Sequence, residues 1–352
     1  MTASTTTFRE QAHDLDAVLE GLGPDLGPRA LVTGAGGFLG RHLVEALVRL
    51  GCEVRALDVT PAFIERTGIE TVIADVRDEA AVAAACAGVD VVFHTAARIV
   101  LHGIGPKAVR DEVWSINEGG TRTLLAAARA AGVGRFVFTS THNVVLDGPC
   151  HELDETAPYA THFVDVYTPS KIAAERALWA FHRKTGFPVI SLNPSLILGP
   201  GDDRVSSTGD VKLFLERKLP SIPWGGLSYV DVRDLAPVFV RAATQGEVGI
   251  RYPLGAVNCT VAHFLQDLER LSGVKGPRLR LPKRLELLGA RVMERAMRAM
   301  GKAPDLDYAS AQMSQRFWYI DSSRARAELG FSPRPTDETL RDTIAALRGA
   351  GG

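Results

Sequence analysis

Long apolar runs are missing from this sequence, and so is an excess of either charge. No uninterrupted apolar stretch approaches the about 18 residues that a membrane-spanning helix needs. Residues 1–20 have neither the basic nor the apolar segment of a secretory signal. The 40 basic and 41 acidic side chains nearly cancel, so no overall field attracts nucleic acid or an anionic membrane. We therefore expect a cytoplasmic protein with no nucleic-acid partner and no transmembrane segment.

Paired cysteine motifs are missing as well. The four cysteines are scattered without C-x-x-C spacing, at Cys52, Cys86, Cys150 and Cys259. This pattern favours free thiols in a reducing compartment over a disulfide framework. We expect no metal site.

From residue 30 onward, short β-rich apolar runs alternate with longer helical patterns. The strand-like runs are ALVT (30–33), EVRALD (53–58), TVIAD (71–75), VVFH (91–94), RFVFTS (135–140) and PVISLN (188–193). Three of the helical patterns between them end in glycine, as helices commonly do. The alternation predicts an α/β fold, a Rossmann-type doubly wound parallel sheet with helices on both faces.

The pattern divides the chain into three parts. Residues 1–27 form an N-terminal extension, for which an amphipathic helix and a disordered leader are both open. Residues 28–202 carry the alternation and predict a Rossmann-type domain. Beyond this point the rhythm loosens, so we expect residues 203–352 to form a smaller, mixed substrate-binding lobe with returns of the chain to the core.

A glycine-rich turn, LVTGAGGFLG (31–40), follows the first predicted strand. Gly34, Gly37 and Gly40 let the backbone approach a pyrophosphate, whose charge meets the N-terminus of the helix that follows. Phe38 and Leu39 belong to the same turn and are expected at the cofactor.

Asp58 ends the second predicted strand, 24 positions after the first glycine of the turn. A carboxylate there can accept hydrogen bonds from both hydroxyls of the adenosine ribose and repels a 2′-phosphate. The sequence therefore predicts NAD, in preference to NADP, as the cofactor.

Tyr167 and Lys171 stand four residues apart in YTPSK (167–171). On a helix this spacing puts both side chains on one face. By itself the spacing is common and proves no chemistry.

Seven motifs occur in the order and spacing of the extended short-chain dehydrogenase/reductases, which this sequence resembles. They are TGAGGFLG, ADVRD (74–78), VVFHTAA (91–97), NEGGT (117–121), FVFTST (136–141), YTPSK and NPSLILGPGD (193–202). VFHTAA, RFVFTSTHNVV and the late FWYIDSSRARAELGF resemble, more narrowly, the 3β-hydroxysteroid dehydrogenase branch of this epimerase/dehydratase superfamily. The match is dense up to residue 202 and thin from there to about residue 315.

The resemblance implies roles for individual residues. Tyr167 would be the general acid/base, and Thr141, with Ser140 as a nearby competitor, would hydrogen-bond the reacting oxygen. Lys171 would favour the phenolate and hold the nicotinamide ribose. The other residues expected at the NAD are Asp75 and Val76 at the adenine, Ala96 and Ala97 along the ribose path, Asn117, Thr139, and Pro194 beside the nicotinamide.

The sequence departs from the family pattern at three points. Asn193 stands before the proline of NPSLILGP, where the family usually has arginine, so a lost ion pair and an altered contact with the lobe are both open. His142 and Asn143 replace small residues after Thr141, and contact with the substrate and packing at the strand end are both open for them. The apolar anchor of membrane-bound steroid dehydrogenases is absent.

A basic amphipathic pattern covers residues 281–302 instead. One helical stripe collects Leu281, Leu285, Leu288, Val292, Ala296, Met297 and Met300. A plain surface helix, a lid over an apolar pocket and a peripheral membrane contact are all open.

Taken together, the sequence favours an NAD-dependent oxidoreductase that interconverts a secondary alcohol and a ketone on a hydroxysteroid or similar bulky apolar substrate. A nucleotide-sugar epimerase, dehydratase or reductase is the alternative, because the same Tyr/Lys pair serves it. A non-catalytic NAD-sensing or scaffold protein is a third possibility.

Alanine-rich helices around 110–131 and 170–186 predict a homodimer through a four-helix bundle, with Leu178 and Trp179 at or near the contact.

Overall fold

The computed structural model describes residues 27, 29–61, 68–100, 106–145, 152–300 and 308–349. The helix considered for the N-terminal extension and Cys150 lie outside these residues, whereas Cys52, Cys86 and Cys259 are free thiols. Within the described residues, no helix is both long and apolar enough to cross a membrane. The same ranges hold no cluster of His, Cys, Asp and Glu side chains that could bind a metal ion.

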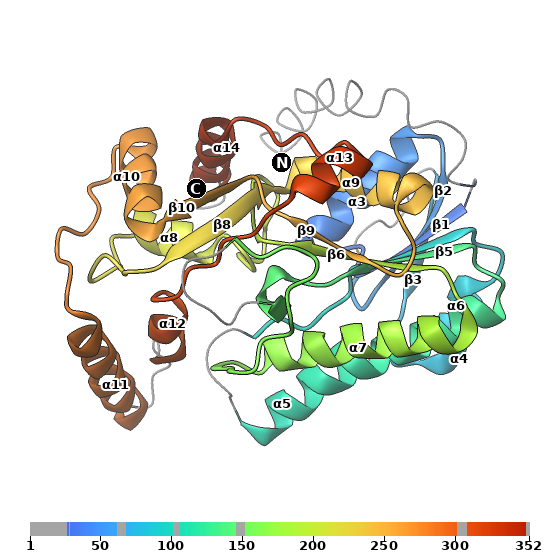
Figure 1. Cartoon of the computed structure of the whole chain (residues 1–352), viewed down its shortest axis with the longest axis horizontal. Coiled ribbons are helices and arrows are strands. Elements are labelled where there is room, and N and C mark those ends of the chain that lie inside the picture. Colours follow the sequence, from blue (N-terminus) through green and yellow to red (C-terminus); the bar gives the residue numbers. More distant parts are fainter. Residues whose placement is uncertain are drawn as a thin grey trace.

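A seven-stranded parallel sheet forms the centre of the molecule (Figure 1). Its order is β3 (Ile69–Ile73), β2 (Glu53–Asp58), β1 (Arg29–Thr33), β4 (Val91–His94), β5 (Arg135–Thr139), β6 (Val189–Pro194) and β9 (Arg251–Leu254). Every neighbouring pair is parallel. The predicted doubly wound Rossmann-type sheet is confirmed; the strands expected at 71–75 and 188–193 are displaced by two residues and one residue, and β9 was not expected.

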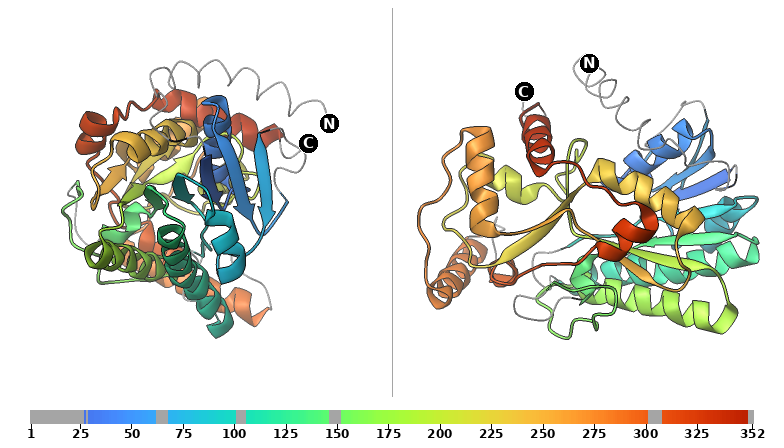
Figure 2. Two further views of the ribbon diagram at one scale, coloured as in Figure 1. Left: turned by 90° about the vertical axis from the view of Figure 1, so that its right-hand side faces the viewer. Right: turned by 45° about the horizontal axis from the view of Figure 1, so that its top comes forward.

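Helices cover both faces of this sheet (Figures 1 and 2), which explains why its strands read as continuous apolar runs. One face carries α3 (Phe38–Arg49) and α9 (Val232–Gln245), and the other carries α4 (Glu79–Cys86), α6 (Thr121–Ala130) and α7 (Tyr167–Thr185). Leu178 of α7 is fully buried in the second of these cores. The expectation that Leu178 lies at a dimer contact was therefore wrong, because its side chain packs on the sheet of its own chain.

The strand order reverses between β1 and β4. In such sheets the loops at the carboxyl ends of the two central strands leave in opposite directions and open a crevice, where ligands bind. The fold thus places a binding site beside the glycine-rich turn that follows β1.

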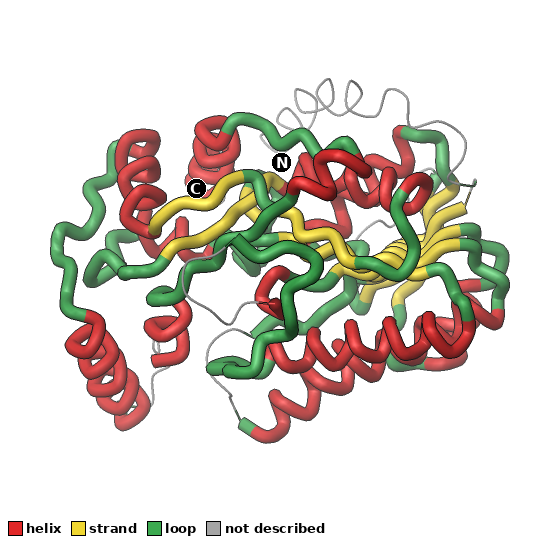
Figure 3. The backbone as a smooth tube through the Cα atoms, viewed as in Figure 1, coloured by secondary structure: helices red, strands yellow, loops and turns green. Residues whose placement is uncertain are grey.

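A second sheet of three strands lies beside the first; Figure 3 shows the strands of both in yellow. It contains β10 (Val257–Thr260), β8 (Gly226–Asp231) and β7 (Leu196–Leu198), and its core includes side chains of α8 (Gly209–Leu215), α10 (Val261–Ser272) and α14 (Thr336–Gly349). Strand β9 and helices α9 and α13 (Ser323–Leu329) return to the first sheet and its core. These returns tie the two parts together.

Helix α11 (Lys283–Ala299) packs on α12 (Tyr308–Met313) at the outer end of the second part (Figure 1). Much of its predicted apolar stripe faces solvent, with Leu285, Leu288, Val292 and Met300 each more than half exposed. The contacts of α11 with the rest of the chain include polar ones, for example hydrogen bonds from Ser221 and Gln315 to Glu286. The helix therefore does not bury this stripe on its own protein.

Candidate active site

The glycine-rich turn leaves no room for side chains at two positions. Gly34 has a φ of +67°, and a Cβ there would lie 2.6 Å from the Cα of Ala96. A Cβ on Gly40 would lie 2.1 Å from the carbonyl oxygen of Gly34. Among the described residues, no side chain caps the N-terminus of α3, and its first turn has no acidic residue. The free N–H groups and the helix dipole therefore suit a phosphate group.

Asp58 lies at the end of β2 and orders the turn. Its Oδ2 accepts a hydrogen bond from the N–H of Gly36 (3.0 Å), and its Oδ1 accepts from the N–H and the hydroxyl of Thr60 (3.0 and 2.9 Å). A carboxylate has about four acceptor positions, so capacity for ribose hydroxyls is left. Arg204, which follows β7, donates to the Thr60 hydroxyl (3.1 Å) and brings a positive charge to this end of the site.

The residues expected at the adenine have partners within the protein. Arg77 binds both oxygens of Asp75 (2.9 and 2.6 Å), and these hydrogen bonds hold the pKa of the Asp75 carboxyl below its usual value. The Val76 side chain is buried, and a Cβ on Gly120 would lie 2.5 Å from it. A contact of either residue with the adenine stays a prediction.

A buried histidine links the cofactor-side ends of three elements. His94 lies between Thr33 of β1 (2.7 Å, Nδ1 to Oγ1) and Thr121 of α6 (2.9 Å, Nε2 to Oγ1). Because the Thr121 hydroxyl donates to the Asn117 carbonyl (2.6 Å), it accepts from Nε2–H, and Nδ1 accepts from Thr33. Burial lowers the pKa of His94 to about 3, so the neutral ring serves as a structural link.

Asn117 lies in a π-helical segment, Ser115–Gly120, that joins α5 (Lys107–Trp114) to α6. Its amide binds the backbone N–H and carbonyl of Arg98 (2.8 and 3.1 Å) and donates to the Ser170 hydroxyl (2.8 Å). Such segments often occur at functional sites. Asn117 thereby fixes the chain that follows Ala96 and Ala97 to the residue before Lys171.

Helix α7 begins at Tyr167 and carries Lys171 one turn later. Asp165 stabilises this beginning, because its carboxylate accepts hydrogen bonds from the N–H (2.6 Å) and hydroxyl (3.0 Å) of Thr168. Tyr167 and Lys171 are 7% and 2% exposed. The Lys171 ammonium donates to the Thr139 carbonyl (2.7 Å) and lies 4.2 Å from the centre of the Phe138 ring.

Burial shifts the pKa of both residues away from the charged form. It raises the pKa of Tyr167, and the nearby Asp165 acts in the same direction. It lowers the pKa of Lys171 to about 7, against the opposing effect of the Glu175 carboxylate. Without cofactor, then, Tyr167 is a neutral phenol, and the expected preference for the phenolate needs a further positive charge.

Thr141 and Ser140 follow β5, and their hydroxyls differ in availability. The Ser140 hydroxyl donates to the Glu175 carboxylate (2.5 Å), whereas the Thr141 hydroxyl accepts from the N–H of Asn143 (3.3 Å) and keeps its proton for another acceptor. This difference favours Thr141 as the donor to a reacting oxygen.

Two buried hydroxyl groups near the ends of β5 and β6 suit the nicotinamide end of a cofactor. Among the described residues, neither the Thr139 nor the Ser195 hydroxyl has a hydrogen-bond partner. Buried polar atoms without partners are uncommon, and an absent ligand explains them. Ser195 directly follows Pro194, which the resemblance puts beside the nicotinamide. The residues present thus fit a dinucleotide.

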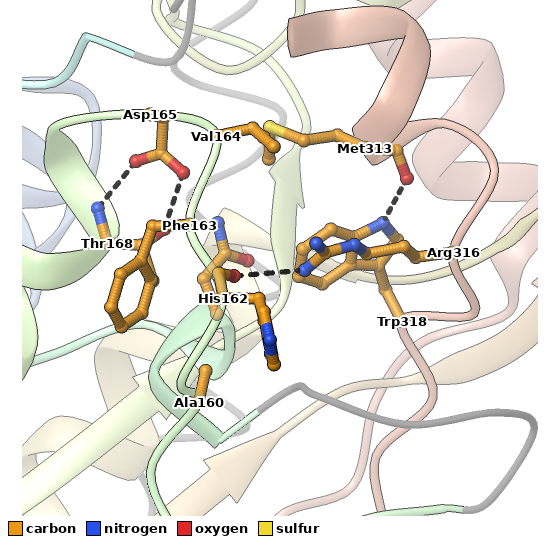
Figure 4. A pocket seen from close by; sticks show the side chains of 10 residues that line it. Ala160, His162, Phe163, Val164, Asp165, Thr168, Met313, Arg316 and Trp318 are labelled. Atoms are coloured by element: carbon orange, nitrogen blue, oxygen red, sulfur yellow. Dashed lines mark hydrogen bonds between the residues drawn. The ribbon is translucent and has the colours of Figure 1, made fainter. Parts of the chain in front are cut away.

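A pocket lies beside Asp165 and Thr168, which flank Tyr167 in the sequence (Figure 4). It is lined by Asn143, Ala160, His162, Phe163, Val164, Asp165, Thr168, Met313, Arg316 and Trp318. The first of these follows Thr141 by two residues, the next six lie at 160–168 around the start of α7, and the last three come from α12 and the chain after it. Half of the lining residues are apolar and half are polar or charged, and Trp318 is fixed by a hydrogen bond from its ring N–H to the Met313 carbonyl (2.9 Å).

His142 lies behind this pocket and is not a free catalytic group. Its Nδ1–H donates to the carbonyl of Pro194 (3.1 Å), and its ring meets the edge of Trp318 with 5.8 Å between ring centres. Burial lowers the pKa of His142 to about 4, so the ring is neutral near pH 7. Of the two unusual residues after Thr141, only Asn143 lines the pocket.

The predicted cofactor residues gather at the carboxyl edge of the sheet, because β1, β2, β4, β5 and β6 all end there. Leu39 belongs to this turn, but its side chain points into the core.

The sequence did not predict Glu175 and Arg251, which form a buried ion pair (3.0 Å) below the site. Glu175 stands four residues after Lys171 and could have been found from this spacing; Arg251 carried no comparable signal.

Comparisons with known proteins agree with this geometry. The sequence model of the NAD dependent epimerase/dehydratase family matches residues 30–255, and the chain belongs to this family. It is 32% identical over 333 residues to "Sterol demethylase protein B" of Methylococcus capsulatus, covering 91% of this chain and 98% of that protein. It is 41% identical over 182 residues to a "3-beta-hydroxysteroid dehydrogenase" of Mycolicibacterium neoaurum, covering 51% of this chain and 50% of the relative.

Among solved structures, the crystal structure of gox2253 is similar over 92% of this chain and 99% of its own, with a TM-score of 0.78 and 30% identity. The chain is therefore an NAD-dependent enzyme, an oxidoreductase of the extended short-chain dehydrogenase/reductase class. The resemblance to the 3β-hydroxysteroid dehydrogenase branch is confirmed.

Proposed function

We propose that the protein interconverts a secondary alcohol and a ketone on a hydroxysteroid or a similar bulky apolar body. The observation that carries this proposal is the position of Tyr167 and Thr141, whose neighbours in sequence line a pocket with an apolar part to its wall. Phe163, Met313 and Trp318 of this pocket suit the burial of hydrocarbon surface. The sterol- and steroid-related names of two relatives support the same substrate class.

In this proposal the protein's own residues handle the proton and the positions of the reactants. NAD, when bound, accepts or returns the hydride. Tyr167 takes the alcohol proton during oxidation and gives it back during reduction, and Thr141 donates a hydrogen bond to the same oxygen. Lys171 in its charged form offsets the effect of burial on the Tyr167 phenol and binds the nicotinamide ribose. The turn from Gly34 to Gly40, Asp58, Thr139 and Ser195 would hold the dinucleotide.

The alternative, a nucleotide-sugar substrate, needs cations for its diphosphate. Several cations of the second part are already engaged: Arg233 pairs with Asp231 and Asp342, Lys212 and Lys218 pair with Glu216, and Arg204 binds Thr60. The pairing of Arg233 is also largely buried, so releasing it would be costly. These contacts favour the apolar alcohol, although one further cation, Arg316, lines the pocket and donates to the His162 carbonyl (3.3 Å).

A turnover assay with Tyr167→Phe tests the proposed function. We expect NADH formation from one or more steroid alcohols in a panel that also contains UDP-sugars. Tyr167→Phe should lower kcat by about a thousandfold or more, because it removes the proton acceptor, while NADH affinity changes little. Phe163→Ala, at the pocket wall, should raise KM for the alcohol and leave kcat less affected. Near-normal turnover by Tyr167→Phe would refute the mechanism, and turnover of a UDP-sugar alone would establish the alternative.

A further inference from the structure

A buried carboxylate lies one helical turn beyond Lys171. Glu175 is 0% exposed. It accepts hydrogen bonds from side chains of three other segments and its own helix: Ser140 (2.5 Å), Asn193 (3.1 Å), Tyr159 (3.3 Å) and Trp179 (3.4 Å). A carboxylate removed from water needs such donors and a cation to stay charged.

The cation comes from the edge strand β9. The Nε of Arg251 lies 3.0 Å from Glu175 Oε1, and the Arg251 side chain is only 12% exposed. Its guanidinium also lies 4.6 Å from the centre of the Tyr159 ring, which holds it against the carboxylate. Strand β9 pairs with β6, so Arg251 enters from the strand next to the one that carries Asn193. Asn193 stands on β6 where the family usually has arginine. In this chain, Arg251 of the neighbouring strand β9 supplies the cation that pairs with Glu175.

The same carboxylate fixes the segment that carries Thr141. The amide of Asn193 donates both to the Thr141 carbonyl (3.2 Å) and to Glu175 Oε2 (3.1 Å). Ser140, the residue before Thr141, donates to the same oxygen. Glu175 is therefore connected to Thr141 through Asn193 and to Lys171 through one turn of α7.

We propose that Arg251 is a positioning residue: by neutralising Glu175 it holds the hydrogen-bond network that sets the positions of Thr141 and Lys171. This inference rests on the roles proposed above for those two residues. Without Arg251 the buried Glu175 carboxylate loses the ion pair that the described structure gives it and keeps only the longer-range attraction of Lys171, so it takes up water or a proton, and its bonds to Ser140 and Asn193 weaken.

Other titratable groups lie near Tyr167 and Lys171 and affect the protonation of these two residues. His94 lies near Lys171 and is neutral, Asp165 lies near Tyr167, and Glu175 favours the charged form of Lys171. Of these groups, only Glu175 is linked to both Lys171 and the Thr141 segment.

Relocating the cation tests the proposal. Arg251→Ala should lower kcat about a hundredfold, as small displacements of catalytic groups do, and should weaken NADH binding several-fold in a fluorescence titration. Adding Asn193→Arg in the same chain returns a guanidinium to Glu175 from β6 and should recover most of both losses. The matched control is Arg135→Ala, which removes a half-buried arginine that donates to the Gly246 carbonyl; its losses should not be recovered by Asn193→Arg.

A second route covers the case in which the double variant fails to fold. Arg251→Lys keeps the charge and should retain turnover within about tenfold of the wild type, and millimolar guanidinium should restore part of the activity and NADH affinity of Arg251→Ala. Wild-type behaviour of Arg251→Ala would overturn the proposal, as would losses that neither Asn193→Arg, guanidinium nor lysine recovers. If the wild type binds NADH but oxidises no alcohol, the proposed function fails while the NADH titrations still decide this inference.

Discussion

Asp58 and Arg204 bring opposite charges to the two sides of Thr60, at the adenosine end of the proposed cofactor site. Asp58 offers acceptors to ribose hydroxyls and repels a phosphate there, whereas Arg204 would attract one. Asp203, the neighbour of Arg204, is paired with Arg41 of α3. The preference between NAD and NADP therefore depends on Asp58 outweighing Arg204.

We expect Asp58→Ala to weaken NADH binding about tenfold, because charge-assisted hydrogen bonds to the ribose are lost, and to admit NADPH. The control is Asp58→Ala/Arg204→Ala, which should bind neither cofactor well, since the cation that would receive the 2′-phosphate is gone. Fluorescence titrations with both reduced cofactors measure the effect. Equal affinity of the wild type for NADH and NADPH would contradict this assignment.

Lys171 makes stability depend on pH in a defined direction. Its pKa is about 7 in the folded protein and 10.5 for a free side chain, so between these values the unfolded chain binds a proton that the folded chain does not. Stability therefore rises with pH across this window, by up to about 1.4 kcal/mol per pH unit for one proton. The full cost of burying the ammonium is present below pH 7.

Chemical unfolding of the cofactor-free protein between pH 7 and 9 should show this rise in the wild type and a flatter profile in Lys171→Met. Lys184→Met, at an exposed position near the end of the same helix, is the control and should keep the wild-type profile. Parallel profiles for the wild type and Lys171→Met would show that Lys171 stays charged when buried.

Residues in continuous motifs could be predicted from the sequence, whereas residues brought together by strand pairing could not. Tyr167 and Lys171 stand four apart on one helix, so their common face follows from helix geometry. Arg251 reaches Glu175 only because β9 pairs in parallel with β6, and 56 residues separate these two strands. No periodicity in the sequence encodes that register.

Helix α11 presents an apolar stripe outward with basic residues beside it. Its two acidic residues face the protein, where Glu286 accepts from Gln315 and Glu294 accepts from the N–H of Tyr308. Lys283, Arg284 and Arg295 are exposed. This distribution is typical of a helix that lies in the interface of an anionic bilayer.

We predict that the protein sediments with vesicles that contain anionic lipid and much less with neutral ones. Leu288→Gln/Val292→Gln should reduce the partition coefficient about tenfold or more, because two exposed apolar side chains no longer enter the bilayer. Val59→Gln/Ile73→Gln changes two equally exposed apolar residues elsewhere and should have no effect. Unchanged partitioning of the α11 variant, or no sedimentation of the wild type, would exclude this contact.

The strands that alternate with helices were predictable as elements, whereas the short strand β7 of the second sheet and the edge strand β9 of the first were not. Strands β1, β2, β4, β5 and β6 are mostly buried, so their apolar composition marks them, whereas the edge strand β3 is only partly buried. Strand β7 has three residues and β9 contains Pro253, so neither gives a strand pattern, and tertiary pairing forms them. The outward direction of the α11 stripe also could not be read from its spacing, which is the same for a helix packed on a core.

At the scale of the whole molecule, we keep the prediction of a homodimer formed by the long helix of α5 and α6 together with α7. These helices lie side by side on one face of the sheet (Figure 1), and Trp114, Ala126 and Ala180 are exposed on them. Light scattering at micromolar concentration should give the mass of a dimer. Ala126→Arg/Ala180→Arg should give a monomer through steric and charge conflict, whereas Ala296→Arg/Ala299→Arg on α11 should not.

The position of β9 has a consequence for synthesis on the ribosome. Strand β6 leaves the exit tunnel well before β9, since the whole of β7, α8, β8 and α9 comes between them. Until β9 has emerged, the nascent chain exposes β6 as an apolar edge strand with unpaired backbone groups, and such edges recruit other chains. Nascent chains halted between residues 195 and 250 should therefore be bound by chaperones or aggregate, and a fragment cut at residue 202 should not yield a stable nucleotide-binding domain.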